Sequence, residues 1–148
     1  MTGNLPLVSI VMATYNRAAT IERAVNSVLS QSYPNVELII VDDGSKDNTL
    51  DILSRYNNPA IRIFRHEKNK GVTAAKNTGL NQLKGEWFTI LDSDDEMVPD
   101  ALSVMMKIPL EADPSITAIT CNCIDTTTRT FSGKGPGKDG PVSVDELM

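Results

Sequence analysis

The sequence predicts an α/β domain with a mostly parallel sheet covered by helices on both faces. Short apolar runs that suit buried strands alternate with segments in which apolar residues recur every three or four positions, the spacing of an amphipathic helix. Strands joined by helices make right-handed crossovers and therefore pair in parallel. A chain of 148 residues, 41% of them hydrophobic, is long enough to bury one core of this kind.

Five mainly apolar runs are the expected strands. In chain order they read "LVSIVMAT", "VELIIV", "IRIF", "WFTIL" and "SITAITCNCI". Nearly unbroken apolar strands are typical of a sheet that is buried on both faces. The third run alternates in character, which favours a place nearer the sheet edge.

The segments between these strands are the expected helices. They cover residues 18–32, 49–56, 72–84 and 100–108. Gly85 is placed to end the third helix, and Pro99 is placed to begin the fourth.

The organisation changes near residue 125. Residues 125–148 are rich in Thr, Gly and Pro and contain no long apolar run. We expect a hairpin and loop there, followed by the first turn of a helix at "SVDELM". The sequence therefore divides into a domain over 1–124 and an incomplete second part over 125–148, which predicts a fragment of something longer.

Charge and composition exclude several classes of protein. The net charge of -5 argues against nucleic-acid binding, which needs a basic surface. No apolar run reaches the ~18 residues of a membrane span, and the first residues lack a signal-peptide pattern. We expect a cytoplasmic chain, and membrane association of a longer parent protein stays open. Cys121 and Cys123 suit neither a usual disulfide nor a zinc site.

Ligands of parallel α/β sheets bind outside the carboxyl ends of the strands, so the residues after each strand are the candidate site. These stretches read "ATYNR", "DDGSKD", "RHEKNKG" and "DSDDE". None carries the glycine pattern of a dinucleotide or phosphate loop. The single histidine, His66, leaves little room for a histidine-dependent triad and is interpreted as a loop residue.

The stretch "LDSDDE" places four acidic groups at the end of an apolar strand. Carboxylates suit hard cations such as Mg²⁺ and Mn²⁺, which often share their coordination shell with substrate phosphates. A calcium loop counted from Asp92 fails, because Met97 stands where Gly is required and Ser103 where Glu is required. The competing interpretation is helix capping before Pro99, although one cap needs one or two acids.

Four stretches together resemble the family 2 glycosyltransferases of the GT-A fold over residues 6–110. They read "VSIVMATYNR", "IIVDDGSKDNT", "NKGVTAAKNTGL" and "GEWFTILDSDDEMVPDAL". The resemblance implies a Rossmann-like sheet, a nucleotide-diphospho-sugar donor that is often a UDP-sugar, and a saccharide or lipid-linked acceptor. It also implies Mn²⁺ or Mg²⁺ and an inverting single displacement.

Matching positions carry the family's donor-binding roles to individual residues. Tyr15 would line the nucleotide pocket and Asp43 would hydrogen-bond the base. Lys76 stands where relatives more often have Arg, so the charge is kept but the bidentate fork is lost.

The Asp-x-Asp pair of the family matches the acidic stretch. Asp92 would face the ribose, Asp94 would bind the metal that bridges the diphosphate, and Ser93 between them is grouped with the donor-binding residues. A cation placed there turns repulsion between carboxylates and phosphates into coordination.

An inverting transfer needs a general base to deprotonate the acceptor. In the family it comes from the acceptor-binding part, and the candidates available here, Glu111, Asp125 and Asp145, match no motif. The resemblance thus makes 1–124 the donor-binding domain, with the base beyond residue 148. Two alternatives stay open: a non-catalytic nucleotide-sugar binding module, and a metal-dependent nucleotidyl or phosphoryl transferase.

Overall fold

The computed structural model describes residues 5–111, 119 and 123–132. The chain divides into two compact units, residues 1–107 and residues 108–148. The predicted boundary at residue 124 separated donor-binding from acceptor-binding parts, and this functional division stays a prediction.

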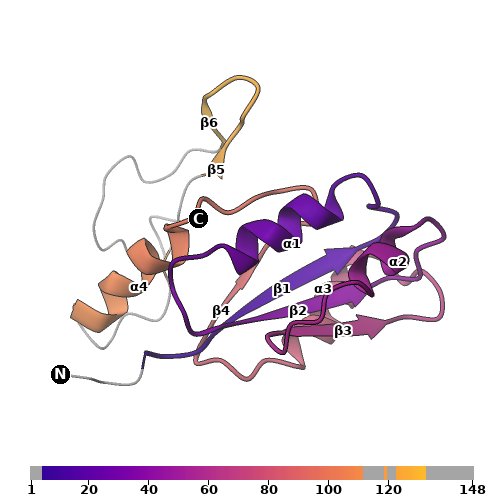
Figure 1. Cartoon of the computed structure of the whole chain (residues 1–148), viewed down its shortest axis with the longest axis horizontal. Coiled ribbons are helices and arrows are strands. Elements are labelled where there is room, and N and C mark those ends of the chain that lie inside the picture. Colours follow the sequence, from indigo (N-terminus) through magenta and orange to yellow (C-terminus); the bar gives the residue numbers. More distant parts are fainter. Residues whose placement is uncertain (1–4, 112–118, 120–122, 133–148) are drawn as a thin grey trace. The chain divides into compact units, whose positions relative to one another are not determined.

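The first unit is built on a four-stranded sheet whose strands are all parallel (Figure 1). The strands are β1 (Val8–Thr14), β2 (Val36–Asp42), β3 (Ile61–Arg65) and β4 (Trp87–Ile90). Their order is β3-β2-β1-β4, so the alternating strand β3 lies at an edge, as predicted. The α/β fold class is confirmed.

Helices α1 (Ile21–Leu29), α2 (Thr49–Leu53), α3 (Val72–Leu80) and α4 (Ala101–Glu111) alternate with these strands. Three of them are shorter than the apolar spacing indicated. Helix α2 ends early because the amides of Arg55 and Tyr56 bond the carbonyls of Ile52 and Leu53, the tighter pattern of a closing turn.

The larger core lies on one face of the sheet, where α1 and α4 contribute. Elements β1, β2, α1, α2 and α4 contribute side chains to it, among them Ile10, Met12, Ile21, Val25, Val28, Leu38, Ile40, Leu53, Leu102 and Met106. Burial of such apolar side chains stabilises the fold by about 1.5–3 kcal/mol each.

Helix α3 covers the other face of the sheet. It contacts β1 and β2, and Ala75 packs with Ala13, Val41 and Phe64. The approach depends on Gly79, because a Cβ atom at this position would overlap Cγ1 of Val11. Helices therefore cover both faces, as predicted.

A buried polar network closes the amino ends of the strands. Glu37, at 6% exposure, accepts hydrogen bonds from Ser9 Oγ at 2.6 Å, from Arg62 Nη1 at 3.1 Å and from the Lys84 amide at 2.8 Å. Burial raises the pKa of Glu37, but these hydrogen bonds and the nearby Arg62 charge outweigh burial and hold the pKa below its usual value.

The second unit contains a hairpin of β5 (Cys123–Ile124) and β6 (Phe131–Ser132), which pair antiparallel. Asp125 closes its turn by accepting the amides of Thr127 and Thr128, each at 2.8 Å. The hairpin expected after residue 124 is therefore present. Cys121, most of the predicted strand 115–124 and the helical turn at "SVDELM" lie outside the described residues. Within the described residues, no helix has the length and apolar character to cross a bilayer.

Candidate functional site

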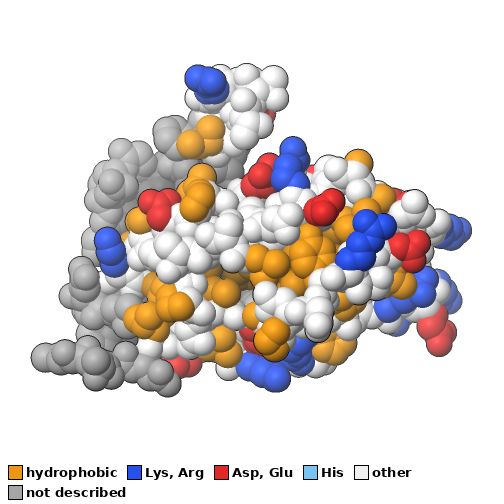
Figure 2. All heavy atoms as spheres, viewed as in Figure 1, with side chains coloured by type: hydrophobic (Ala, Val, Ile, Leu, Met, Phe, Trp, Pro, Cys, Tyr) orange, Lys and Arg blue, Asp and Glu red, His pale blue; other side chains and the backbone are white. Residues whose placement is uncertain are grey.

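The parallel topology gathers the four strand-tip stretches at one edge of the sheet. Figure 2 shows acidic and basic side chains interspersed at the right-hand end of the molecule, the end at which the arrowheads of β1 and β2 lie in Figure 1. Tyr15, directly after β1, is 37% exposed. An aromatic ring exposed beside charged groups is suited to stacking on a planar ligand.

The loop after β1 is anchored to the loop after β2. Three consecutive backbone amides donate to side chains of that second loop and of the first residue of α2: Asn16 to Ser45 Oγ (2.9 Å), Arg17 to Thr49 Oγ1 (2.8 Å) and Ala18 to Asp47 Oδ2 (3.0 Å). Asn16 has a φ of 53°, the left-handed conformation that Asn tolerates better than most residues. The backbone that carries Tyr15 and Arg17 is therefore held firmly.

Asp43, directly after β2, is buried at 2% exposure. Its carboxylate accepts hydrogen bonds from His66 Nδ1 at 2.6 Å, from the Lys70 amide at 2.9 and 3.1 Å, and from the Gly71 amide at 2.8 Å. Burial raises the pKa of Asp43, but these hydrogen bonds and the His66 ring outweigh burial and hold the pKa below its usual value. Asp43 thus pins the segment between β3 and α3.

His66, in the loop that follows β3, joins two elements. Its ring is 7% exposed, and its Nε2 lies 2.9 Å from Thr78 Oγ1 on α3. The Thr78 hydroxyl also donates to the Ala74 carbonyl at 3.0 Å. The ring therefore connects the tip of β2 to the helix on the far face of the sheet. The predicted loop position of His66, between β3 and α3, is confirmed, and the bridge is an addition to it.

The segment after β4, residues 91–100, is called the strap below. Asp92 and Asp94 lie on it with side chains 55% and 50% exposed. Lys76 Nζ lies 2.8 Å from Asp92 Oδ1, and Arg17 Nη2 lies 3.2 Å from Asp94 Oδ2. The structure thus brings Lys76 to the acidic pair.

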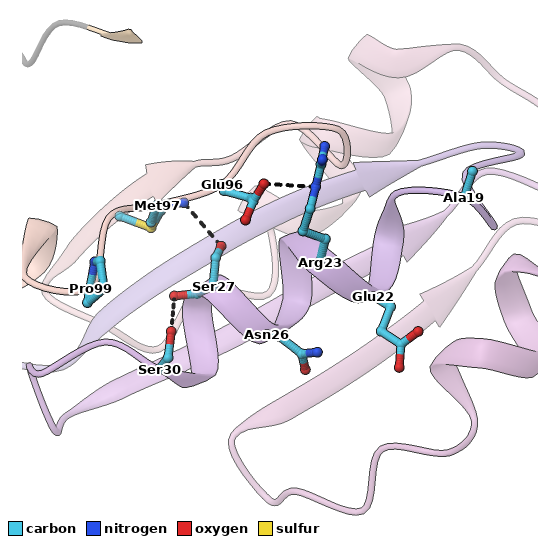
Figure 3. Close-up of a pocket in the computed structure, with 9 residues that line it drawn as sticks. All are labelled: Ala19, Glu22, Arg23, Asn26, Ser27, Ser30, Glu96, Met97 and Pro99. Atoms are coloured by element: carbon cyan, nitrogen blue, oxygen red, sulfur yellow. Dashed lines mark hydrogen bonds and ion pairs between the residues drawn. The ribbon is translucent and has the colours of Figure 1, made fainter. Parts of the chain in front are cut away.

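The strap is bonded along one face of α1. Thr20 Oγ1 donates to the carbonyl of Ser93 at 2.9 Å, and Ser93 itself is buried. Further along, Arg23 pairs with Glu96 at 2.8 Å and the Met97 amide donates to Ser27 Oγ at 3.1 Å (Figure 3). Residues 20, 23 and 27 share one helical face, so the strap lies along that face.

An open hollow of about 610 Å³ lies between α1 and the strap. Figure 3 shows residues of both segments around it, and its lining includes Glu22, Asn26, Ser30 and Pro99. None of the six predicted site residues lines this hollow. We therefore place the candidate site at the strand tips, where the charged and aromatic side chains meet.

Helix capping does not account for the acidic groups of the strap. Helix α4 begins at Ala101, and its amide at Leu102 bonds Gln31 Oε1 at 3.1 Å. The amides of Ala101 and Val104 bond backbone carbonyls. Asp92 and Asp94 instead point their carboxylates at cationic side chains. About half of each aspartate side chain stays exposed, so a metal ion can still reach the carboxylates.

The donor set suits a magnesium- or manganese-type site completed by its ligand. Within the described residues, no three His, Cys, Asp or Glu side chains converge as a ready-made metal site. Mg²⁺ commonly takes only one or two carboxylates and fills its octahedron with phosphate oxygens and water. Asp94, half exposed and bonded to a single guanidinium nitrogen in this structure, fits that requirement.

Two residues of the site escaped the sequence reasoning. Arg17 was part of a quoted motif without a role, and His66 was assigned none. Arg17 follows the first predicted strand and Asp94 follows the fourth, so opposite charges at two strand ends were a signal for this ion pair. The His66 bridge gave no such signal, because its partners Asp43 and Thr78 come from separate elements.

The domain is an open parallel α/β sheet, and its exposed, ion-paired carboxylates lie at the carboxyl ends of the strands, where ligands of such sheets bind. The profile of glycosyl transferase family 2 matches residues 9–135. The chain belongs to this family.

Relatives by sequence include enzymes of glycan synthesis. The GalNAc(5)-diNAcBac-PP-undecaprenol beta-1,3-glucosyltransferase of Campylobacter jejuni is 32% identical over 97% of this chain and 48% of its own length. The chondroitin synthase of Pasteurella multocida is 38% identical over 88% of this chain and 13% of its own length. The chain spans less than half the length of these relatives.

Solved structures agree with this fold. S. aureus TarS 1–349 in complex with UDP-GlcNAc matches with a TM-score of 0.68 and 31% identity, over 71% of this chain and 31% of that one. The mannosyltransferase PcManGT of Pyrobaculum calidifontis, in complex with GDP-Man and Mn²⁺, matches with a TM-score of 0.65 and 28% identity, over 75% and 34%. These likenesses confirm the GT-A type of sheet expected from the sequence.

Proposed function

We propose that this chain binds the nucleotide-diphospho-sugar donor of a glycosyltransferase at the carboxyl ends of its strands, with a UDP-sugar as the donor class. The observation that carries the proposal is the acidic pair. Asp92 and Asp94 lie two residues apart at the tip of β4, half exposed, each held by one cationic side chain. The relatives' complexes with UDP-GlcNAc and with GDP-Man and Mn²⁺ support a nucleotide-sugar ligand.

The nucleotide would lie across the tips of β1 and β2. Tyr15 offers an exposed ring for the base. Asp43 is bonded to His66 and to two loop amides, so it would meet the base from a rigid, ionised position. Asp92 would face the ribose, with Ser93 holding the strap in place through its carbonyl bond to Thr20.

Carboxylates and a diphosphate repel one another unless a cation lies between them. Asp94 would hold Mn²⁺ or Mg²⁺, which when bound neutralises the charge that develops on the departing nucleoside diphosphate. Lys76 adds a second positive charge beside the pair. As an ammonium it serves as a point charge rather than a bidentate fork.

The transfer step itself would need residues that these strand tips lack. An inverting displacement requires a carboxylate base on the acceptor side. Asp125 is a poor base, because amide hydrogen bonds from Thr128 and Thr127 hold its pKa below the usual value. The side chain of Glu111 and all of Asp145 lie outside the described residues.

We therefore infer that these 148 residues carry donor binding, and that the acceptor site and the base belong to a longer protein. The lengths of the relatives support this division. The acceptor class would be a saccharide or a lipid-linked saccharide, in keeping with the undecaprenol-linked saccharide and the chondroitin in the relatives' names.

Calorimetric titration of UDP tests the proposal. We expect binding with Mn²⁺ present and a loss of at least tenfold in affinity with chelator or in Asp94→Asn. Asp51→Asn, an exposed acid on α2, is the matched control and should bind as the wild type does. An equal UDP affinity with Mn²⁺, with chelator and in Asp94→Asn would contradict the proposal.

A further inference from the structure

We propose that Arg17 is a diphosphate-binding residue that neutralises Asp94 in the ligand-free chain and passes to the donor's phosphates when a divalent cation occupies Asp94. The inference rests on the proposed donor site. It adds a residue to which neither the sequence motifs nor the relatives' names assign a role.

The first support is the separation between a fixed backbone and a free side chain. The Arg17 amide donates to Thr49 Oγ1 at 2.8 Å. Its carbonyl accepts the amides of Thr20 and Ile21 at 3.0 and 2.9 Å, at the start of α1. The side chain is 46% exposed, so the guanidinium can change partner without moving the loop.

The second support is the weakness of the present contact. Arg17 reaches Asp94 through one nitrogen at 3.2 Å, and the Asp94 side chain is also half exposed. Exposed pairs of this kind contribute little, with a median of about 0–1 kcal/mol. A divalent cation held by Asp94 and phosphate oxygens would therefore displace the guanidinium readily.

The third support is position. A diphosphate bridged to Asp94 by a cation lies next to that carboxylate, and the Arg17 guanidinium already lies there. Its planar fork matches phosphate oxygens in a bidentate way that Lys76 cannot reproduce. Arg17 thus supplies at the diphosphate the fork that is lost where Lys76 stands.

The test measures two affinities in wild type, Arg17→Gln and Arg23→Gln. Arg23 is the matched control, because it pairs with Glu96 on the same strap at 2.8 Å and meets Asp94 only at the backbone carbonyl. The affinity for Mn²⁺ without nucleotide is read from the paramagnetic resonance of the free ion. The affinity for UDP is read by calorimetry at saturating Mn²⁺ and physiological ionic strength, where long-range charge effects are screened.

Arg17→Gln should bind Mn²⁺ about two- to fivefold tighter, because the competitor for Asp94 is gone. It should bind UDP about tenfold more weakly, because a charge-assisted contact to phosphate is lost. Arg23→Gln should change neither affinity by more than about twofold.

The proposal that Arg17 exchanges Asp94 for phosphate is overturned by either of two results for Arg17→Gln. One is an Mn²⁺ affinity equal to that of the wild type, and the other is a UDP affinity equal to that of Arg23→Gln. If wild-type UDP binding depends on Mn²⁺ and Asp94 while Arg17→Gln matches the control, only the role of Arg17 is lost. If UDP binding depends neither on Mn²⁺ nor on Asp94, the proposed donor site is wrong, and the proposed role of Arg17 is wrong with it.

Discussion

His66 Nδ1 lies 2.6 Å from Asp43 Oδ1, and the opposite ring nitrogen lies 2.9 Å from Thr78 Oγ1. One buried ring thus joins the tip of β2 to α3, across the segment that would border the nucleotide. Buried polar groups are costly when unpaired, so the three side chains should depend on one another.

Replacing His66 by Phe should lower the free energy of unfolding by about 2 kcal/mol, because Asp43 and Thr78 each lose a buried partner. Urea denaturation measures the loss. Thr78→Val removes only one of the two contacts and should cost about half as much. A His66→Phe chain as stable as the wild type would show that the bridge contributes nothing.

Asp43 should make the free energy of unfolding depend on pH in the acidic range. Its pKa is lowered in the folded chain, so its contribution is fully present above the unfolded value of about 3.9 and is lost as pH falls below that value through the folded pKa. The stability gap between wild type and Asp43→Asn, measured by urea denaturation, should therefore be constant near neutral pH and shrink below about pH 4. A gap that stays constant into acid would contradict this assignment.

Glu37→Gln should destabilise the chain by about 2 kcal/mol, since Arg62 loses its ionised partner at the amino ends of the strands. The value lies below the roughly 3–5 kcal/mol of a broken, fully buried pair, because the Arg62 side chain is a quarter exposed. Thermal or urea unfolding measures it, with the exposed Glu67→Gln as control. Equal stability of the two variants would argue against a structural role for this network.

Tyr15→Ala should weaken UDP binding by about tenfold, the typical value of one base stacked on an aromatic ring, whereas Tyr15→Phe should keep most of the affinity. Calorimetry at saturating Mn²⁺ measures both. If Phe is as damaging as Ala, the hydroxyl rather than the ring face is the contact, and the stacking assignment is wrong.

The alternation of elements and the strand tips were predictable because apolar periodicity is a local signal. The ends of the helices were less predictable. Helix α2 ends at Leu53 through backbone hydrogen bonds, which the amino-acid composition does not reveal. The chemistry of the acidic stretch singled out Asp92 and Asp94, and the family motif gave each of them its separate role.

The partners of the site residues were beyond a local pattern. Arg17 contacts Asp94, and Lys76 contacts Asp92, only because folding brings the ends of β1 and β4 and helix α3 together. The bridging contacts of His66 were missed for the same reason, because a buried bridging histidine and an exposed loop histidine look alike in sequence.

The most direct test locates the cation relative to the strand tips. With UDP present, replacing Mg²⁺ by Mn²⁺ should broaden the amide resonances of residues 15–17 and 91–96, since paramagnetic relaxation acts only near the ion. Resonances of residues 81–86, beside the Glu37 network at the other end of the sheet, should stay sharp. Broadening centred on the 81–86 turn, or equal broadening throughout, would contradict a donor site at the carboxyl ends of the strands.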